Sequence, residues 1–147
     1  MGFTLQVKGQ ETIYFGVDMI SSAHVQLSTP HDSKAKSTDN AATLWVTGKL
    51  LSAEMGSGNS DTLKLFDWSL VPAQSAEAYR DVIVEVISAD QIFRKIHLPN
   101  AFVVDYSERY TDSAGVGEFA LILRQRADRI TLVKATSSGV DTVEKVE

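Results

Sequence analysis

Apolar and polar residues alternate along much of this chain, with the period of two that is typical of half-buried β-strands. The alternation is clearest over residues 3–7, 22–28, 42–51 and 117–127. In the last of these segments, Phe119, Leu121 and Leu123 share one face, opposite Glu118 and Arg124. Short β-branched stretches predict further strands at residues 12–15, 82–87 and 129–134.

Residues 93–110 form the longest predicted strand, which Pro99 and Asn100 interrupt. Strands in globular proteins are typically about 5–6 residues long. Because proline cannot donate to a sheet ladder, we expect a bulge, a bend or a sheet edge at Pro99. The unusual length indicates a sheet that extends beyond its own core.

One short amphipathic helix is predicted over residues 60–70. Ser60 is a suitable N-cap, and the helix has to end before Pro72. Apolar residues spaced three and four apart give the helix one apolar face: Leu63, Phe66 and Leu70.

A long polar segment, residues 29–41, separates two of the predicted strands. Loops of this length without structure of their own are usually functional or disordered. The last residues, 135–147, are weakly patterned and polar, so we expect a tail there. The prediction is a mainly β, antiparallel barrel or sandwich of about eight strands with one helix, forming a single domain over residues 1–134.

Composition excludes several classes of protein. The 147 residues include no cysteine, which excludes disulfides, thiolate metal sites and cysteine nucleophiles. The formal net charge of −5 argues against a nucleic-acid-binding domain, which usually presents a basic face. No apolar run approaches the ~20 residues of a membrane-spanning helix, and the N-terminus lacks the pattern of an export signal.

Candidate catalytic and metal-binding residues are few. None of the three histidines, His24, His31 and His97, lies in a metal-binding motif, so we expect no metal site. A hydrolase built from His97, Asp105 and Ser107 is an alternative, but no G-x-S-x-G turn presents a nucleophile. The glycine pairs near residues 56–58 and 115–117 match no nucleotide-binding motif. We therefore expect no catalytic residue, no cofactor and no enzymatic activity.

Four segments carry a resemblance to a known family: FDWSL at 66–70, YRDVIVEVIS at 79–88, FRKIHLPNAFVVDYSERY at 93–110 and GEFALILRQ at 117–125. Their order and spacing resemble the Hcp-like tube proteins of type VI secretion systems. They are also similar to the related tail-tube proteins of contractile phages, tailocins and injection machines. The strand–long loop–strand arrangement of residues 22–51 fits the same family, whose members use an extended loop to contact the neighbouring ring.

The resemblance implies a structural protein that forms hexameric rings, which stack into a tube. A contracting sheath drives such a tube through a target envelope. The implied partners are further copies of the chain, the sheath, the baseplate or spike, and tape-measure or effector proteins. The implied location is the cytoplasm during assembly and then the inner tube of a particle, which is delivered outside the cell on firing. Neither recognition of a nucleic-acid sequence nor membrane anchoring by the chain itself is implied.

The polar segment, one tryptophan and one face of the long strand supply the predicted contacts between subunits. These candidates are Thr29, Pro30, His31, Asp32, Ser33, Lys34, Lys36, Asp39, Asn40, Trp68, Asp105, Ser107 and Arg109. Trp68 follows a charged residue on the short helix, so we expect it to be partly exposed at such a contact. A monomeric β-sandwich that binds a surface ligand remains a further alternative.

Overall fold

The computed structural model describes residues 1–28, 41–51, 58–112, 116–125, 134–137 and 140–141. They form nine strands, one α-helix and one 3-10 turn. The strands are β1 (Gly2–Lys8), β2 (Thr12–Phe15), β3 (Ile20–Ser28), β4 (Ala41–Leu51), β5 (Arg80–Ser88), β6 (Gln91–Arg109), β7 (Val116–Gln125), β8 (Lys134–Ser137) and β9 (Val140–Asp141). The helix is α1 (Gly58–Ser69), and η2 (Ala76–Ala78) is the turn. The predicted mainly β fold is confirmed.

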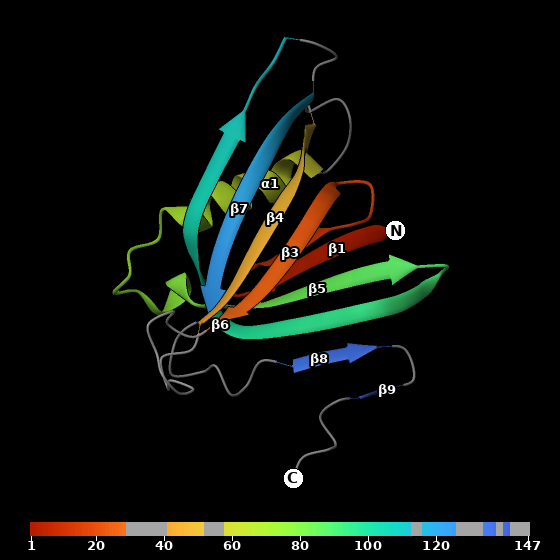
Figure 1. The fold of residues 1–147 in the computed structure, drawn as a ribbon. Helices are drawn as coiled ribbons and strands as arrows, with labels where there is room; N and C mark the ends of the chain where they lie inside the picture. Colours follow the sequence, from red (N-terminus) through yellow and green to blue (C-terminus); the bar gives the residue numbers. More distant parts are fainter. Residues whose placement is uncertain (29–40, 52–57, 113–115, 126–133, 138–139, 142–147) are drawn as a thin grey trace.

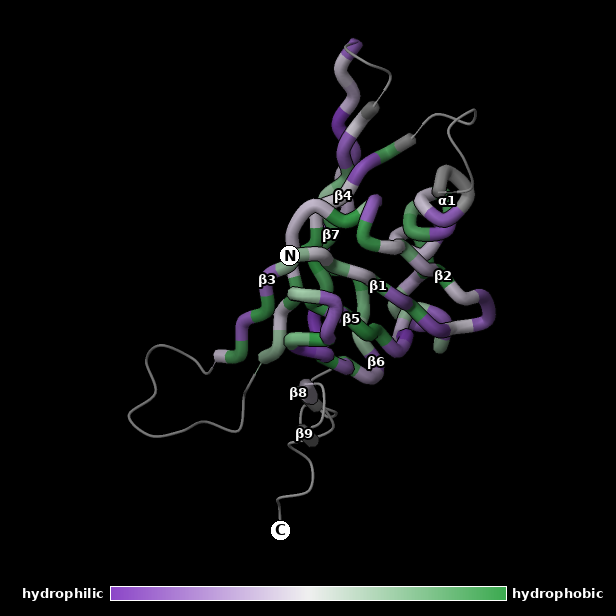
Figure 2. The backbone as a smooth tube through the Cα atoms, turned by 90° about the vertical axis from the view of Figure 1, so that its right-hand side faces the viewer, coloured by the Kyte–Doolittle hydropathy of each residue, from purple (hydrophilic) through white to green (hydrophobic). Residues whose placement is uncertain are grey.

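The strands form one antiparallel sheet in the order β2-β1-β5-β6-β7-β4-β3, with β8 on β6 and β9 on β8. The sheet curls so that β1 and β3, which are not hydrogen-bonded to each other, lie side by side (Figure 1). This curl encloses the core in a barrel-like arrangement. Figure 2 shows the same strands turned by 90°, with hydrophobic and hydrophilic residues interspersed along them.

Strand β6 is 19 residues long and joins two parts of the sheet. Its first half pairs with β5, and the register runs out at Arg80 opposite Ala101. Its second half pairs with β7, beginning with Ala101 opposite Gln125. Between the halves, Asn100 has a φ of 59°, a left-handed conformation that turns the strand. The bend predicted at Pro99 and Asn100 is confirmed, and Figure 1 shows β6 changing direction there.

The core lies between the two halves of the curled sheet and beneath α1. The core-facing residues predicted for β7, namely Phe119, Leu121 and Leu123, are all buried. In β4 the predicted core-facing residues Ala42, Leu44 and Val46 are buried, and so is Thr43, which was assigned to the opposite face. Period-two alternation thus identified the buried face of the long strands correctly.

The apolar face of the predicted helix is not its buried face. Leu63, Phe66 and Leu70 are 58%, 43% and 69% exposed, whereas the buried residues of α1 are Thr62, Leu65 and Trp68. Both sets have helical spacing, so the period alone does not distinguish them. The face that carries the indole is buried because Trp68 fills the core. The helix also begins at Gly58, so Ser60 lies within its first turn and is not its N-cap.

The C-terminal prediction also needs correction. Most of the strand predicted at residues 129–134 lies outside the described residues. Residues 135–137, which were assigned to a polar tail, belong to β8, and Ala135 and Thr136 pair with Ile96 and Lys95 in the first half of β6. In the described part of the chain, no helix has the length and apolar character needed to cross a membrane.

Gly48 provides a test of how tightly this core is packed. A Cβ at this position would lie 2.5 Å from Cε2 of Phe119 and 2.7 Å from the carbonyl oxygen of Met19. Because Phe119 is buried and a backbone oxygen cannot swing aside, we expect Gly48→Ala to lower the free energy of unfolding by about 1–3 kcal/mol. Gly16→Ala is the matched control, since the nearest atom there is 3.9 Å away. Equal urea midpoints for the two variants would contradict this view of the packing.

Candidate subunit interface

Four strands, β3, β4, β7 and the second half of β6, form a sheet whose outer face points away from the core. Cross-strand register groups its outward side chains into rows. The four rows are His24–Trp45–Ile122–Asp105, Ser22–Thr47–Ala120–Ser107, Lys49–Glu118–Arg109 and Gln26–Thr43–Arg124–Phe102. The predicted contact residues Asp105, Ser107 and Arg109 are therefore brought onto one exposed face, in three different rows.

This outer face is polar and nearly balanced in charge. Ser22 and Thr47 share a hydrogen bond of 2.6 Å between their hydroxyl oxygens. Trp45 is half-buried, and His24 lies edge-on to its ring with 4.8 Å between ring centroids. The predicted contact residues do not include Trp45 or Ser22, although the alternation of residues 22–28 and 42–51 places both on the polar face.

Both edges of this four-stranded sheet lack a hydrogen-bonded neighbour among the described strands. One edge is β3, which pairs only with β4. The other is the second half of β6, on the side where the ladder with β5 stops at Arg80, the first residue of β5. Natural monomers usually protect such edges with charges, proline or bulges. The nine residues of β3 contain no proline and none of Asp, Glu, Lys or Arg.

The directions of the four strands make the two edges complementary. Each neighbouring pair is antiparallel, so the strand direction alternates across β3, β4, β7 and β6. With an even number of strands, β3 and β6 run in opposite directions. If the sheet of a second copy continued from one edge to the other, the new pair would also be antiparallel, which preserves the ladder geometry.

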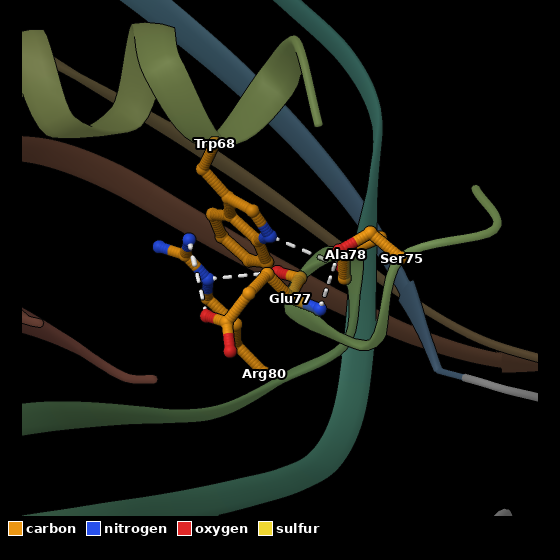
Figure 3. A network of polar contacts seen from close by, with 5 residues as sticks. All are labelled: Trp68, Ser75, Glu77, Ala78 and Arg80. Carbon is orange, nitrogen blue, oxygen red and sulfur yellow. Dashed lines mark hydrogen bonds and ion pairs between the residues drawn. The ribbon is translucent and has the colours of Figure 1, made fainter. Parts of the chain in front are cut away.

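The segment that follows α1 is fixed beside β6 by a polar network around Trp68 (Figure 3). The indole N–H donates to the carbonyl oxygen of Ala78 at 3.1 Å, and the guanidinium carbon of Arg80 lies 5.2 Å from the indole centroid. Nε of Arg80 donates to the carbonyl oxygen of Glu77 at 3.0 Å, and the Glu77 N–H donates to Oγ of Ser75. Burial lowers the pKa of Arg80, against the raising effect of the Glu77 and Glu11 carboxylates.

Trp68 itself is 2% exposed, so the expected partial exposure of this residue is wrong. The physical reason is the same network, because a buried indole needs a partner for its N–H and finds one at Ala78. The indole belongs to the core of the protomer.

On the inner side of β6, the Glu108 carboxylate joins two tyrosines. It accepts a hydrogen bond from the Tyr106 hydroxyl at 2.5 Å and another from Tyr110. The Tyr106 ring stacks on Phe119 and contacts Phe66 edge-on. Burial, together with the bond to Glu108, raises the pKa of Tyr106 well above its usual value.

The alternative hydrolase site is not assembled. His97 lies on the first half of β6, where its Nε2 is 3.8 Å from Oδ2 of Asp81. Asp105 and Ser107 lie on the second half, beyond the bend, and eight residues of strand separate His97 from Asp105 by about 26 Å along the chain. The described residues also contain no group of three or more His, Asp or Glu side chains suited to a metal ion.

The remaining candidates, at positions 29–40, lie outside the described residues. Their predicted contacts with a neighbouring ring therefore remain a prediction. What the structure describes is where their segment begins and ends, because Ser28 and Ala41 are the last pair of the β3–β4 ladder.

Taken together, the fold and this face define an antiparallel β protein with two open, complementary sheet edges. No family model and no curated protein sequence matches the chain. Among solved structures, the chain is similar to Hcp1 from Flavobacterium johnsoniae, with a TM-score of 0.57 and 16% identity over 95% of this chain and 96% of that one. It is also similar to a chain of the anti-feeding prophage baseplate, with a TM-score of 0.53 and 14% identity over 95% of both. The predicted Hcp-like tail-tube fold is thereby confirmed.

The Tyr106–Glu108 contact predicts a pH dependence of stability. The pKa of Tyr106 is higher in the folded state than its usual value near 10, so the folded state holds this proton more tightly. The stabilisation is complete below about pH 10 and is lost as the pH rises further. We expect the free energy of unfolding of the wild type to fall more steeply between about pH 9 and 11 than that of Tyr106→Phe. Urea titrations that give parallel pH profiles for the two proteins would contradict the assignment.

Proposed function

We propose that this chain is the protomer of the inner tube of a contractile injection system or phage-like tail. The observation that carries the proposal is the pair of open, oppositely directed edges on the four-stranded sheet of an Hcp-like fold. A protein with this sheet gains backbone hydrogen bonds by pairing β3 of one copy with β6 of the next. The function follows from assembly and uses no chemical step.

Contacts between two different edges are heterologous, so they generate a ring when the rotation closes. We propose six subunits per ring, in keeping with the 6-fold symmetrised baseplate in which a similar chain occurs. Closure would remove every open edge of the four-stranded sheet. This also accounts for the absence of charge along β3, because a strand that is paired in the assembly needs no protection.

In such a ring, we propose that the outer face of the four-stranded sheet lines the lumen. The charged side chains on this face are Lys49, Arg109, Arg124, Asp105 and Glu118. Three are basic and two are acidic, so each copy would contribute a net charge of +1 to the lumen, with hydroxyl groups between the charges. That surface suits a passage that holds no cargo tightly.

The proposed partners are the other parts of the same machine: the sheath outside the tube, the baseplate or spike at its end, and tape-measure or effector proteins inside. We propose that rings assemble in the cytoplasm and leave the cell when the machine fires.

The geometry gives no support to the two alternative functions. A hydrolase is not supported because His97 lies far from Asp105 and Ser107. A binding module for a surface ligand is not supported because the outer face has few exposed aromatic side chains.

Assembly can be tested on the purified chain. We expect sedimentation velocity to detect a concentration-dependent change from protomer to a single large species, and negative-stain microscopy to reveal closed rings or stacked tubes. A strictly monomeric species at every protein and salt concentration would contradict the proposal.

The alternative hydrolase function is tested by a peptidase and esterase screen that compares the wild type with His97→Ala. Activity that is present in the wild type and lost in the variant would favour the hydrolase.

Stacking of rings is proposed to depend on the polar segment between β3 and β4. Because Ser28 and Ala41 already face each other, residues 29–40 can be replaced by an Asn-Gly turn, which fits a two-residue hairpin. We expect circular dichroism and the melting temperature to change little, single rings to form, and tubes to disappear from micrographs. Tubes as long as those of the wild type would contradict the role of this segment.

A further inference from the structure

A small hollow lies at the open edge of β6, just past the point where β5 leaves it. Its volume is about 160 Å³, and it is lined by Trp68, Ser69, Val71, Ala73, Ala78, Tyr79, Phe102 and Val103. All but Ser69 and Tyr79 present apolar or indole surface, and Tyr79 meets Phe102 edge-on. An apolar cavity of about 150 Å³ can hold a benzene molecule, so this hollow has room for one apolar side chain.

Leu27 is an apolar side chain with no place in its own core. It lies near the end of β3, on the same face as Ala23 and Val25, which pack against the core. Leu27 is nevertheless 66% exposed, because the strand continues past the core at that end. A core-facing leucine left in solvent at a sheet edge suggests a neighbour that covers it.

The register places Leu27 and the hollow at the same level of the sheet, on opposite edges. Leu27 pairs with Ala42, whose neighbour Thr43 pairs with Arg124. Ala42 is therefore level with Gln125, which pairs with Ala101 on β6. The hollow begins with the next two residues of β6, Phe102 and Val103.

We propose that Leu27 of one copy fills the hollow between α1 and β6 of the next copy. The inference rests on the proposed ring, in which the β3 edge of one protomer meets the β6 edge of its neighbour. Leu27 would then lie on the core-facing side of the joined sheet, which is also the side of Val103 and Trp68. It would lie at the same level of the sheet as the hollow. The hollow is rigid before the contact forms, because the Trp68–Ala78 hydrogen bond holds its wall. The contact sets the register of the edge pairing, which backbone hydrogen bonds alone leave open to slippage.

The same substitution, leucine to aspartate, at two exposed positions tests the contact. Leu27→Asp places a carboxylate in the apolar hollow, so we expect rings to be lost at concentrations where the wild type assembles. Leu63→Asp is the control, because Leu63 is similarly exposed, at 58%, but lies on the outer face of α1. Both protomers should melt at the wild-type temperature, since both leucines lie in solvent. The milder Leu27→Ala should weaken assembly roughly tenfold or more.

A cross-link identifies the two surfaces directly. The chain contains no cysteine, so Leu27→Cys combined with Ala73→Cys adds the only thiols. Within one protomer these positions lie at opposite edges of the four-stranded sheet. The spacing between strands separates the two edges by about 14 Å across the sheet, which is too far for a disulfide. We expect oxidation to give a ladder of covalent multimers ending at the ring size, whereas each single-cysteine variant gives no ladder.

The outcomes separate this inference from the proposed function. Wild-type rings, together with a ladder and loss of rings in Leu27→Asp, support both. Wild-type rings without a ladder, or rings that persist in Leu27→Asp, overturn the contact and leave the tube protomer standing. A ladder of open chains without any ring supports the contact and overturns the ring. A monomeric wild type without a ladder overturns both.

Discussion

The bend in β6 is the constraint on which the rest of this structure depends. A single strand of 19 residues pairs with β5 before Ala101 and with β7 after it. The change of partner requires a change of strand direction, which Asn100 provides with a left-handed backbone. Gln125 secures the bend by donating from its side-chain amide to the carbonyl oxygen of Pro99. Because β5 begins opposite this bend and pairs only with the first half of β6, the second half of β6 is left with an open edge.

The open edge matters because the chain around it is held in place. Between Trp68 on α1 and Arg80, the first residue of β5, the chain passes Ala78, and the indole hydrogen bond fixes its path. The same residues close the core and form the wall of the hollow beside Phe102. Core packing and the proposed subunit contact thus share one set of side chains. A substitution that loosens the Trp68 network would therefore affect assembly through the shape of the edge.

Much of the fold was predictable because its strands are long and one face of each is buried. Phe119, Leu121 and Leu123 could be assigned to the core from alternation alone, and Pro99 marked the bend. The helix could not be oriented in the same way, since Leu63 and Phe66 have the same spacing as Leu65 and Trp68. What decides between the two faces is a distant carbonyl at Ala78, which no local pattern records.

The candidate site was predictable in part for the same reason. Asp105, Ser107 and Arg109 share a face because alternate residues of a strand do. Their neighbours Trp45 and Ser22 come from strands far away in sequence, so only the register brings them together. The hollow was beyond prediction, because it depends on where β5 leaves β6 and on the position of the chain after α1.

The central claim is that β3 of one copy forms a backbone ladder with the second half of β6 of the next. Residue-resolved amide hydrogen exchange tests this most directly, comparing assembled particles with the dissociated protomer. The account predicts that the amides of β3 and of residues 104–109 that point away from β4 and β7 become strongly protected on assembly, while amides within the hydrogen-bonded helix α1 change little. Exchange at both edges that is equally fast in the assembled and dissociated states would contradict it.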